Sequence, residues 1–182
     1  LALGLGITAI AGTAMAFPEV GLDNNDRLGD AGVFQYYTVN GGWQTFVRLI
    51  NTSDKGASVK LRFREAANSR EVLDFTVFLS PYDMWVGWTD PDALENGKPG
   101  IRTRDTSCIY PDQGNTGGQS FRDVPSKGGA VRGASFENFA YTGAYADGNT
   151  NPGRATEGHV EVIGVASHGP GPFLTAITHV DR

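Results

Sequence analysis

The sequence contains a single cysteine, Cys108, among 182 residues. One thiol supplies no disulfide framework within the chain, so the fold must depend on its apolar side chains. Three fates stay open for Cys108: a buried thiol, a disulfide bridge to another chain, or a bridge to a cysteine beyond Arg182 if the protein continues there. Hydrophobic residues make up 40% of the chain, which is enough for a packed core.

Runs of basic residues are also absent. Lysine and arginine number 15 against 20 aspartates and glutamates, which gives a formal net charge of −5. Nucleic-acid binding depends on a basic face that displaces counterions from phosphates, so the composition argues against this class of partner. The same charge gives no help in binding anionic lipid.

Catalytic constellations are missing as well. The chain has three histidines and many serines, but no Gly-x-Ser-x-Gly elbow. Nothing near Cys108 marks a reactive thiolate, which a basic residue or a helix N-terminus would produce. We therefore expect a protein that is not an enzyme and that needs no cofactor, although calcium stays possible.

Long apolar segments are lacking except at the N-terminus. Residues 1–16, LALGLGITAIAGTAMA, are uncharged and end in Ala14-Met15-Ala16. A membrane helix needs about 20 apolar residues, so no stable transmembrane span is predicted. The small-x-small ending is typical of a signal peptide cleaved after Ala16, which implies secretion or display at the cell surface. If the segment is retained, we expect an apolar strand that pairs with a neighbouring subunit.

What the chain does contain is period-two alternation. In residues 57–65, Val59, Leu61 and Phe63 alternate with basic residues, as in a strand buried on one face. We expect the charged face of this strand to form a ladder of ion pairs with the acidic residues of 71–80. Further strands are predicted at 33–39, 43–51, 71–80, 84–88 and 159–166, and 173–180 fits either a strand or a short helix.

Turn residues separate these strands. Asn40-Gly41 supplies positive φ angles and predicts a tight hairpin between 33–39 and 43–51. Ser80-Pro81-Tyr82-Asp83 predicts a second turn. The spacing from 33 to 88 indicates consecutive antiparallel strands.

The fold class follows from this spacing. We predict an all-β protein, an antiparallel β-sandwich of jelly-roll or Ig-like type that covers 33–182 and is truncated if the chain continues. Residues 17–32 are expected to form a linker or irregular segment. The glycine-rich and proline-rich region 89–156 predicts short strands joined by long loops.

Several segments together resemble a known group of proteins. The run Asn68-Ser69-Arg70-Glu71-Val72-Leu73-Asp74-Phe75, followed by Leu79-Ser80-Pro81-Tyr82-Asp83 and a tryptophan, resembles uncharacterised bacterial exported proteins described as cell surface proteins. Ser107-Cys108 and the segments Glu157-Gly158-His159 and Glu161-Val162-Ile163 are similar to later parts of that pattern. The resemblance implies an envelope or extracellular location, and it brings no catalytic residues and no known ligand.

Oxygen-rich loops are the candidates for calcium. Asp23 and Asp26 lie in one such loop, and Asp147 and Asn149 lie in another. Hard cations prefer carboxylate and amide oxygens on flexible backbone. The alternative is an ordinary Asx turn, in which the side chain binds its own backbone.

His159 and Glu161 are the candidates for a transition-metal site. They are two residues apart, so on a strand they point to the same face. With Glu157 they would form a row of three ligands, as a metal-assisted hydrolase would require. The alternative is a solvent-exposed face opposite Val160 and Val162.

Trp85 and Trp88 are the candidates for ligand binding. Their spacing of three places them on opposite faces of one strand, so at least one can lie outside the core. An exposed tryptophan would stack on a sugar ring, whereas core packing is the alternative for each. This pair indicates a secreted carbohydrate-binding or matrix-binding module.

Taken together, these patterns favour an exported structural protein of the cell surface. We expect it to assemble with itself, as a homo-oligomer, filament or matrix, through β-strand addition. Surface polysaccharide is the alternative partner.

Overall fold

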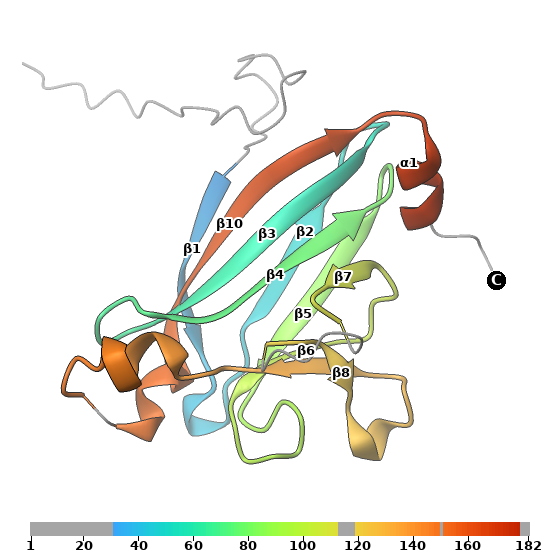
Figure 1. Ribbon diagram of the computed structural model, residues 1–182. Coiled ribbons are helices and arrows are strands. Elements are labelled where there is room, and N and C mark those ends of the chain that lie inside the picture. Colours follow the sequence, from blue (N-terminus) through green and yellow to red (C-terminus); the bar gives the residue numbers. More distant parts are fainter. Residues whose placement is uncertain (1–30, 113–118, 150, 179–182) are drawn as a thin grey trace, which may run out of the picture.

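The computed structural model describes residues 31–112, 119–149 and 151–178. Two antiparallel five-stranded sheets pack against each other, which confirms the predicted all-β sandwich (Figure 1). Sheet A has the order β1–β10–β3–β4–β7 and sheet B the order β2–β5–β6–β9–β8. The first strand begins at residue 31, two residues before the predicted start of the domain. The expected signal peptide lies outside the described residues.

The strand bounds show one long-stranded sheet and one shorter-stranded sheet. Sheet A comprises β1 (Ala31–Thr38), β10 (Glu157–His168), β3 (Gly56–Glu65), β4 (Glu71–Leu79) and β7 (Cys108–Tyr110). Sheet B comprises β2 (Phe46–Ile50), β5 (Met84–Asp90), β6 (Gly100–Thr103), β9 (Arg132–Ser135) and β8 (Arg122–Asp123). The described helical elements are η1 (Asn40–Gly42), η2 (Pro125–Lys127), η3 (Phe139–Tyr141), η4 (Gly143–Tyr145), η5 (Pro152–Thr156) and α1 (Pro172–Ile177).

The core lies between the two sheets and follows the predicted alternation. Leu61 and Phe63 of β3 are fully buried, and they pair in register with Phe75 and Leu73 of β4. Aromatic rings fill the centre, since Phe75 packs edge-on against Phe121 with ring centroids 4.8 Å apart. Burial of these apolar side chains is the main stabilising term of the fold.

The outer face of sheet A carries the predicted ladder of ion pairs. Lys60 lies 2.6 Å from Asp74, and Arg62 lies 3.2 Å from Glu71. Arg64 reaches across to Glu161 of β10 at 2.9 Å. Exposed pairs of this kind add about 0–1 kcal/mol each, so their main effect is to keep this face polar and solvated.

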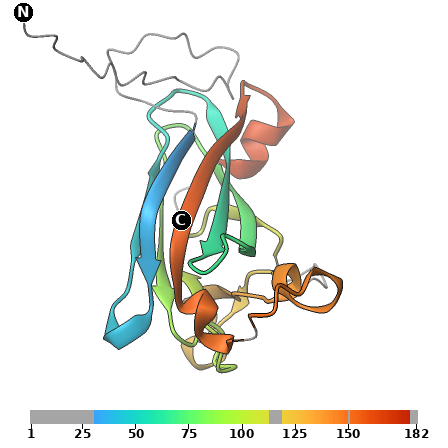
Figure 2. The ribbon, with the colours of Figure 1, turned by 90° about the vertical axis from the view of Figure 1, so that its left-hand side faces the viewer.

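The predicted hairpin at Asn40-Gly41 is wrong. Gly41 and Gly42 do have positive φ angles of 62° and 80°, but they form the 3-10 helix η1. The strands on either side enter different sheets, because β1 pairs with β10 while β2 pairs with β5. η1 therefore joins one edge of sheet A to one edge of sheet B (Figure 2). The predicted run of consecutive antiparallel strands holds for β3–β4, whereas β2 and β3 lie in different sheets.

The C-terminal segment resolves the strand-or-helix alternative in favour of a helix over Pro172–Ile177. This helix packs on the start of β3. A Cβ atom added to Gly56 would lie 2.9 Å from the side-chain ends of both Leu174 and Ile177, so these side chains pack directly on the backbone of β3 at this point. In the described parts of the chain no helix is long and apolar enough to cross a membrane.

Candidate functional site

One half of the outer face of sheet B carries exposed apolar side chains. On β2, Phe46 and Ile50 point outward and lie opposite Trp88 and Met84 of β5. Phe46 is 64% exposed and Ile50 is 54% exposed. The rings of Phe46 and Trp88 approach to 6.5 Å between centroids. We call the surface formed by these residues with Val86 and Arg48 the β2–β5 patch.

Arg48 is the one charged residue in the β2–β5 patch. It lies between Phe46 and Ile50 on β2 and opposite Val86 on β5. It is exposed, and no acidic side chain pairs with it in the described residues. Aromatic residues, methionine and arginine are enriched in protein interfaces, whereas lysine and acidic residues are depleted. The composition of the patch is therefore that of an interface.

The other half of the same face is covered by the chain itself. The 91–98 loop lies over β6 and β9, where Arg102 donates hydrogen bonds to the carbonyl oxygens of Ala93 and Asp92 at 3.0 and 2.6 Å. The same arginine forms an ion pair with Asp90 at 3.0 Å. A Cβ atom on Gly133 would lie 2.7 Å from the Ala93 carbonyl oxygen, so glycine is needed for the loop to lie flat.

No described part of the chain covers the edge of sheet A at β1. Residues 31–36 are all exposed, including Val33 at 63%. The strand contains no charged residue and no proline, which are the usual devices that protect an edge strand from pairing. Its register with β10 is regular from Ala31 to Phe34 and shifts before Tyr37. Alternate N–H and C=O groups of an edge strand point away from its neighbour, so this segment offers free pairing groups.

The opposite edges are closed. β7 has three residues and is followed by Pro111, and β8 has two residues, both charged. The N–H of Glu137 donates to the carbonyl oxygen of Val72 at 2.7 Å, which closes the edge of β4 beyond β7. Very short strands, charge and proline all limit edge-to-edge pairing. We call the edges β1 and β2 together the β1/β2 side, and these closed edges the β7/β8 side.

The structure separates the two predicted tryptophans. Trp88 lies on the outer face of sheet B, within the β2–β5 patch. Trp85 is fully buried and packs against Phe75 with ring centroids 5.8 Å apart. The prediction of opposite faces is confirmed, but Trp85 as a ligand-binding residue is wrong, because the core encloses its ring.

His159 and Glu161 do share the outer face of sheet A, opposite Arg64 and Arg62. The carboxylate of Glu161 is already bound by those two arginines, at 2.9 and 3.6 Å. Glu157, the third predicted ligand, accepts a hydrogen bond from Tyr36 at 2.8 Å. No group of three His, Cys, Asp or Glu side chains is arranged to hold a metal ion in the described ranges.

An arginine takes the place that calcium was predicted to occupy at Asp147 and Asn149. Both carboxylate oxygens of Asp147 accept hydrogen bonds from Arg154 at 2.8 Å, and the carbonyl oxygen of Asn149 accepts a third at 2.8 Å. These bonds hold the pKa of Asp147 well below its usual range. Arg154 therefore binds oxygens that a calcium ion would need in this loop, and calcium binding here stays a prediction. Asp23 and Asp26 lie outside the described residues.

The same arginine neutralises a buried acid. Arg154 donates to Glu65 at 2.9 Å, and both side chains are shielded from solvent. Glu65 also accepts hydrogen bonds from the backbone N–H groups of Ala67 and Arg70. Burial alone would raise the pKa of Glu65, but the bonds from Arg154 and the backbone outweigh it and lower the pKa. The guanidinium also lies 4.1 Å from the centre of the Tyr141 ring. We call Glu65, Arg154 and Asp147 the Arg154 cluster.

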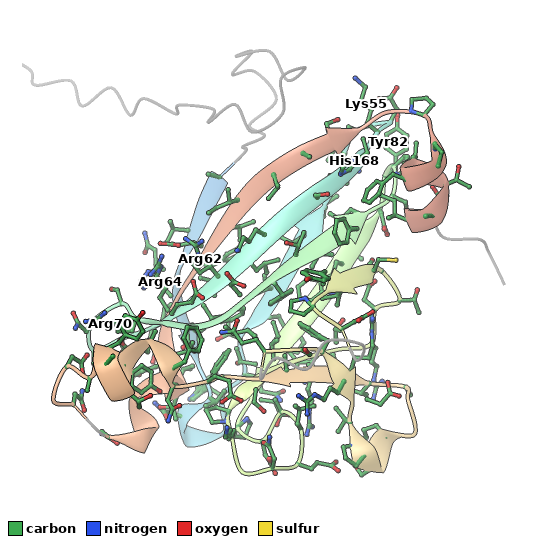
Figure 3. All side chains as sticks on the ribbon, in the orientation of Figure 1. Lys55, Arg62, Arg64, Arg70, Tyr82 and His168 are labelled. Atoms are coloured by element: carbon green, nitrogen blue, oxygen red, sulfur yellow. The ribbon has the colours of Figure 1, made fainter. Side chains whose placement is uncertain are left out.

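Sequence reasoning missed a serine–histidine pair at the end of β10. Ser58 Oγ lies 2.5 Å from Nε2 of His168, whose ring packs on Phe173 of α1 at 4.2 Å (Figure 3). Burial lowers the pKa of His168. Ser58 is buried, and no carboxylate orients the second ring nitrogen within the described residues, so the pair lacks the third member of a triad. Its visible effect is to attach β10 and α1 to β3.

Cys108 is a free thiol exposed on β7. The buried thiol is therefore wrong, while a bridge to another chain and a bridge to a cysteine beyond Arg182 both stay predictions. Comparison of the chain with protein-family models, with curated proteins and with solved structures gives no match.

Proposed function

We propose that this chain is a non-enzymatic structural protein, secreted or displayed on a bacterial cell surface, that assembles with copies of itself through the β1/β2 side. The observation that carries the proposal is the uncharged, exposed edge of β1 next to the apolar β2–β5 patch. An unprotected edge strand invites strand addition, and a contiguous apolar patch marks an interaction surface.

The contrast with the rest of the molecule supports this proposal. The β7/β8 side is closed by short strands and by segment 136–138, and the 91–98 loop covers β6 and β9. A chain that has loops to cover one half of a sheet and leaves Phe46, Ile50 and Met84 exposed on the other half has a surface suited to a partner.

Sedimentation of the protein as isolated from the producing cell tests the proposal. We expect association that grows with protein concentration, and a Val33→Lys/Ile50→Lys double variant should sediment as a monomer. A matched Tyr110→Lys/Tyr145→Lys variant changes two equally exposed residues elsewhere and should associate like the wild type. A wild type that stays monomeric at the highest soluble concentration would contradict the proposal.

A second candidate function is binding of an acidic surface polysaccharide. It is favoured by the paired rings of Phe46 and Trp88 beside the exposed guanidinium of Arg48, which no acidic side chain of the described residues binds. Aromatic rings offer a stacking surface for sugars, and arginine binds carboxylates with two parallel hydrogen bonds. Retention on the producing cell's own polysaccharide, lost in Trp88→Ala and kept in Tyr145→Ala, would support this function. Equal retention of both variants would rule it out.

A further inference from the structure

We propose that self-association begins with a two-fold symmetric contact in which the β1 strands of two copies pair antiparallel, centred on Val33, and join two A sheets into one continuous sheet. This inference rests on the self-association proposed above and specifies its first contact.

Three edges are unsuited to pairing with a second copy. β7 and β8 have three and two residues, which is too short for a stable ladder. β2 has five residues, but a symmetric pairing over its full length places Arg48 directly opposite Arg48 of the second copy. Like charges directly opposite each other destabilise a strand pair. Arg48 therefore protects the β2 edge from pairing with itself.

β1 has no such obstacle. Its eight residues are uncharged, and its first four keep a regular register with β10. In that register Val33 lies opposite Glu161, so its side chain points to the outer face of sheet A together with the ladder of ion pairs. A two-fold axis at Val33 places Val33 beside its own copy on the outer face, as an apolar cross-strand pair.

The same register gives the Phe34 ring a place to pack on the second copy. With the axis at Val33, Phe34 of one copy lies opposite Gly32 of the other. The position that a Cβ atom would occupy at Gly32 has no atom within 4 Å, so there is open space for an aromatic ring. An aromatic side chain packed over a cross-strand glycine compensates for the missing side chain. The partly exposed ring of Phe34 would thereby become covered.

This contact closes on itself. Both copies use the same edge, so an isologous pair has no second β1 edge left for a third copy. The first assembly unit is therefore a closed pair and not a filament. Growth beyond the pair requires a different surface, and the β2–β5 patch remains exposed for that purpose.

Charge variants at position 33 test the pairing. Val33 is 63% exposed, so neither Val33→Lys nor Val33→Asp should alter the fold of one copy, which thermal melting at low concentration checks. Each variant alone places like charges opposite each other, and we expect the dimer Kd to rise at least about tenfold. An equimolar mixture places lysine opposite aspartate and should regain dimers by sedimentation velocity. The matched pair Ile50→Lys and Ile50→Asp on β2 should leave this first dimer unchanged.

The outcomes separate this inference from the proposed function. A wild type that never associates overturns both. Association that is insensitive to charge at residue 33 but lost in Ile50→Lys overturns the β1 contact and leaves self-association standing. Loss of dimers in both Val33 variants without recovery in the mixture overturns the two-fold pairing, because residue 33 would then not face its own copy.

Discussion

The 91–156 region covers sheet edges and faces, whereas the β1/β2 side leaves them exposed. The first supplies a loop over β6 and β9, a backbone hydrogen bond that closes the edge of β4, and Arg154, which neutralises Glu65. The second leaves a sheet edge and an apolar half-face uncovered in the described residues. The difference shows that the long loops complete the fold of one copy, and the β1/β2 side is the surface on which we propose that a second copy binds.

The largest effect on stability is expected from a substitution of Arg154 in the 91–156 region. Arg154→Met leaves Glu65 buried without its opposite charge, and loss of one partner of a buried ion pair costs about 3–5 kcal/mol of unfolding free energy. Urea denaturation at neutral pH measures the loss. The matched variant Arg104→Met removes an exposed arginine and should change stability little. Similar losses in the two variants would show that the Arg154 cluster stabilises nothing.

Low pH should weaken the contribution of the Arg154 cluster to stability. The pKa values of Glu65 and Asp147 are lowered in the folded state, so both bind protons more readily when unfolded. Their contribution is complete above the unfolded values, about 4 for both residue types, and is lost as pH falls through the folded values. Urea denaturation between pH 3 and pH 7 should give a steep decline for the wild type and a shallower one for Arg154→Met. Parallel curves would contradict the assignment.

A smaller effect is expected where the 91–98 loop meets β9. In Gly133→Ala the added Cβ would press on the Ala93 carbonyl oxygen, and such overpacking costs about 1–3 kcal/mol. Gly169→Ala adds the same atom where nothing lies within 4 Å and serves as the control. Thermal melting measures both. If Gly133→Ala and Gly169→Ala have the same melting temperature, the 91–98 loop is not held in the position that covers this half of the face.

The smallest effect should come from His168. Burial lowers its pKa, so the unfolded chain takes up this proton first and stability declines as pH falls below the unfolded value of about 6.5. His168→Gln removes that decline, while the partly buried His159 is the same in both proteins. Melting temperatures at pH 7 and pH 5 should therefore differ more in the wild type than in the variant. An identical pH response would assign no role to this histidine.

Local sequence patterns predicted where the strands lie better than they predicted which strands pair in a sheet. Alternation in residues 57–65 and 71–80 specified both the buried face and the ion-pair ladder, because period-two patterns depend only on adjacent residues. The same parity placed Trp85 and Trp88 on opposite faces. The prediction of a hairpin at Asn40-Gly41 was wrong, because positive φ angles also occur in a 3-10 helix that connects two sheets.

Contacts between distant residues could not be read from the sequence. Arg154 lies in a segment rich in glycine, proline and asparagine, and its partner Glu65 is 89 residues away. Nothing local distinguishes it from a solvated loop arginine, so the sequence left both calcium and an ordinary Asx turn open for this loop. The neighbour of β1 is β10, from the far end of the chain, so its exposed edge also became visible only in the folded molecule.

Hydrogen exchange at the β1 amides is the most direct measurement of whether β1 pairs with a second copy. Exchange rates of residues 31–36 would be followed at low and high protein concentration, with β7 and β8 as internal references. The account predicts that the β1 amides slow as concentration rises, while the short edge strands exchange at unchanged rates. Amides of β1 that exchange equally fast at every concentration, in a protein that otherwise associates, would contradict it.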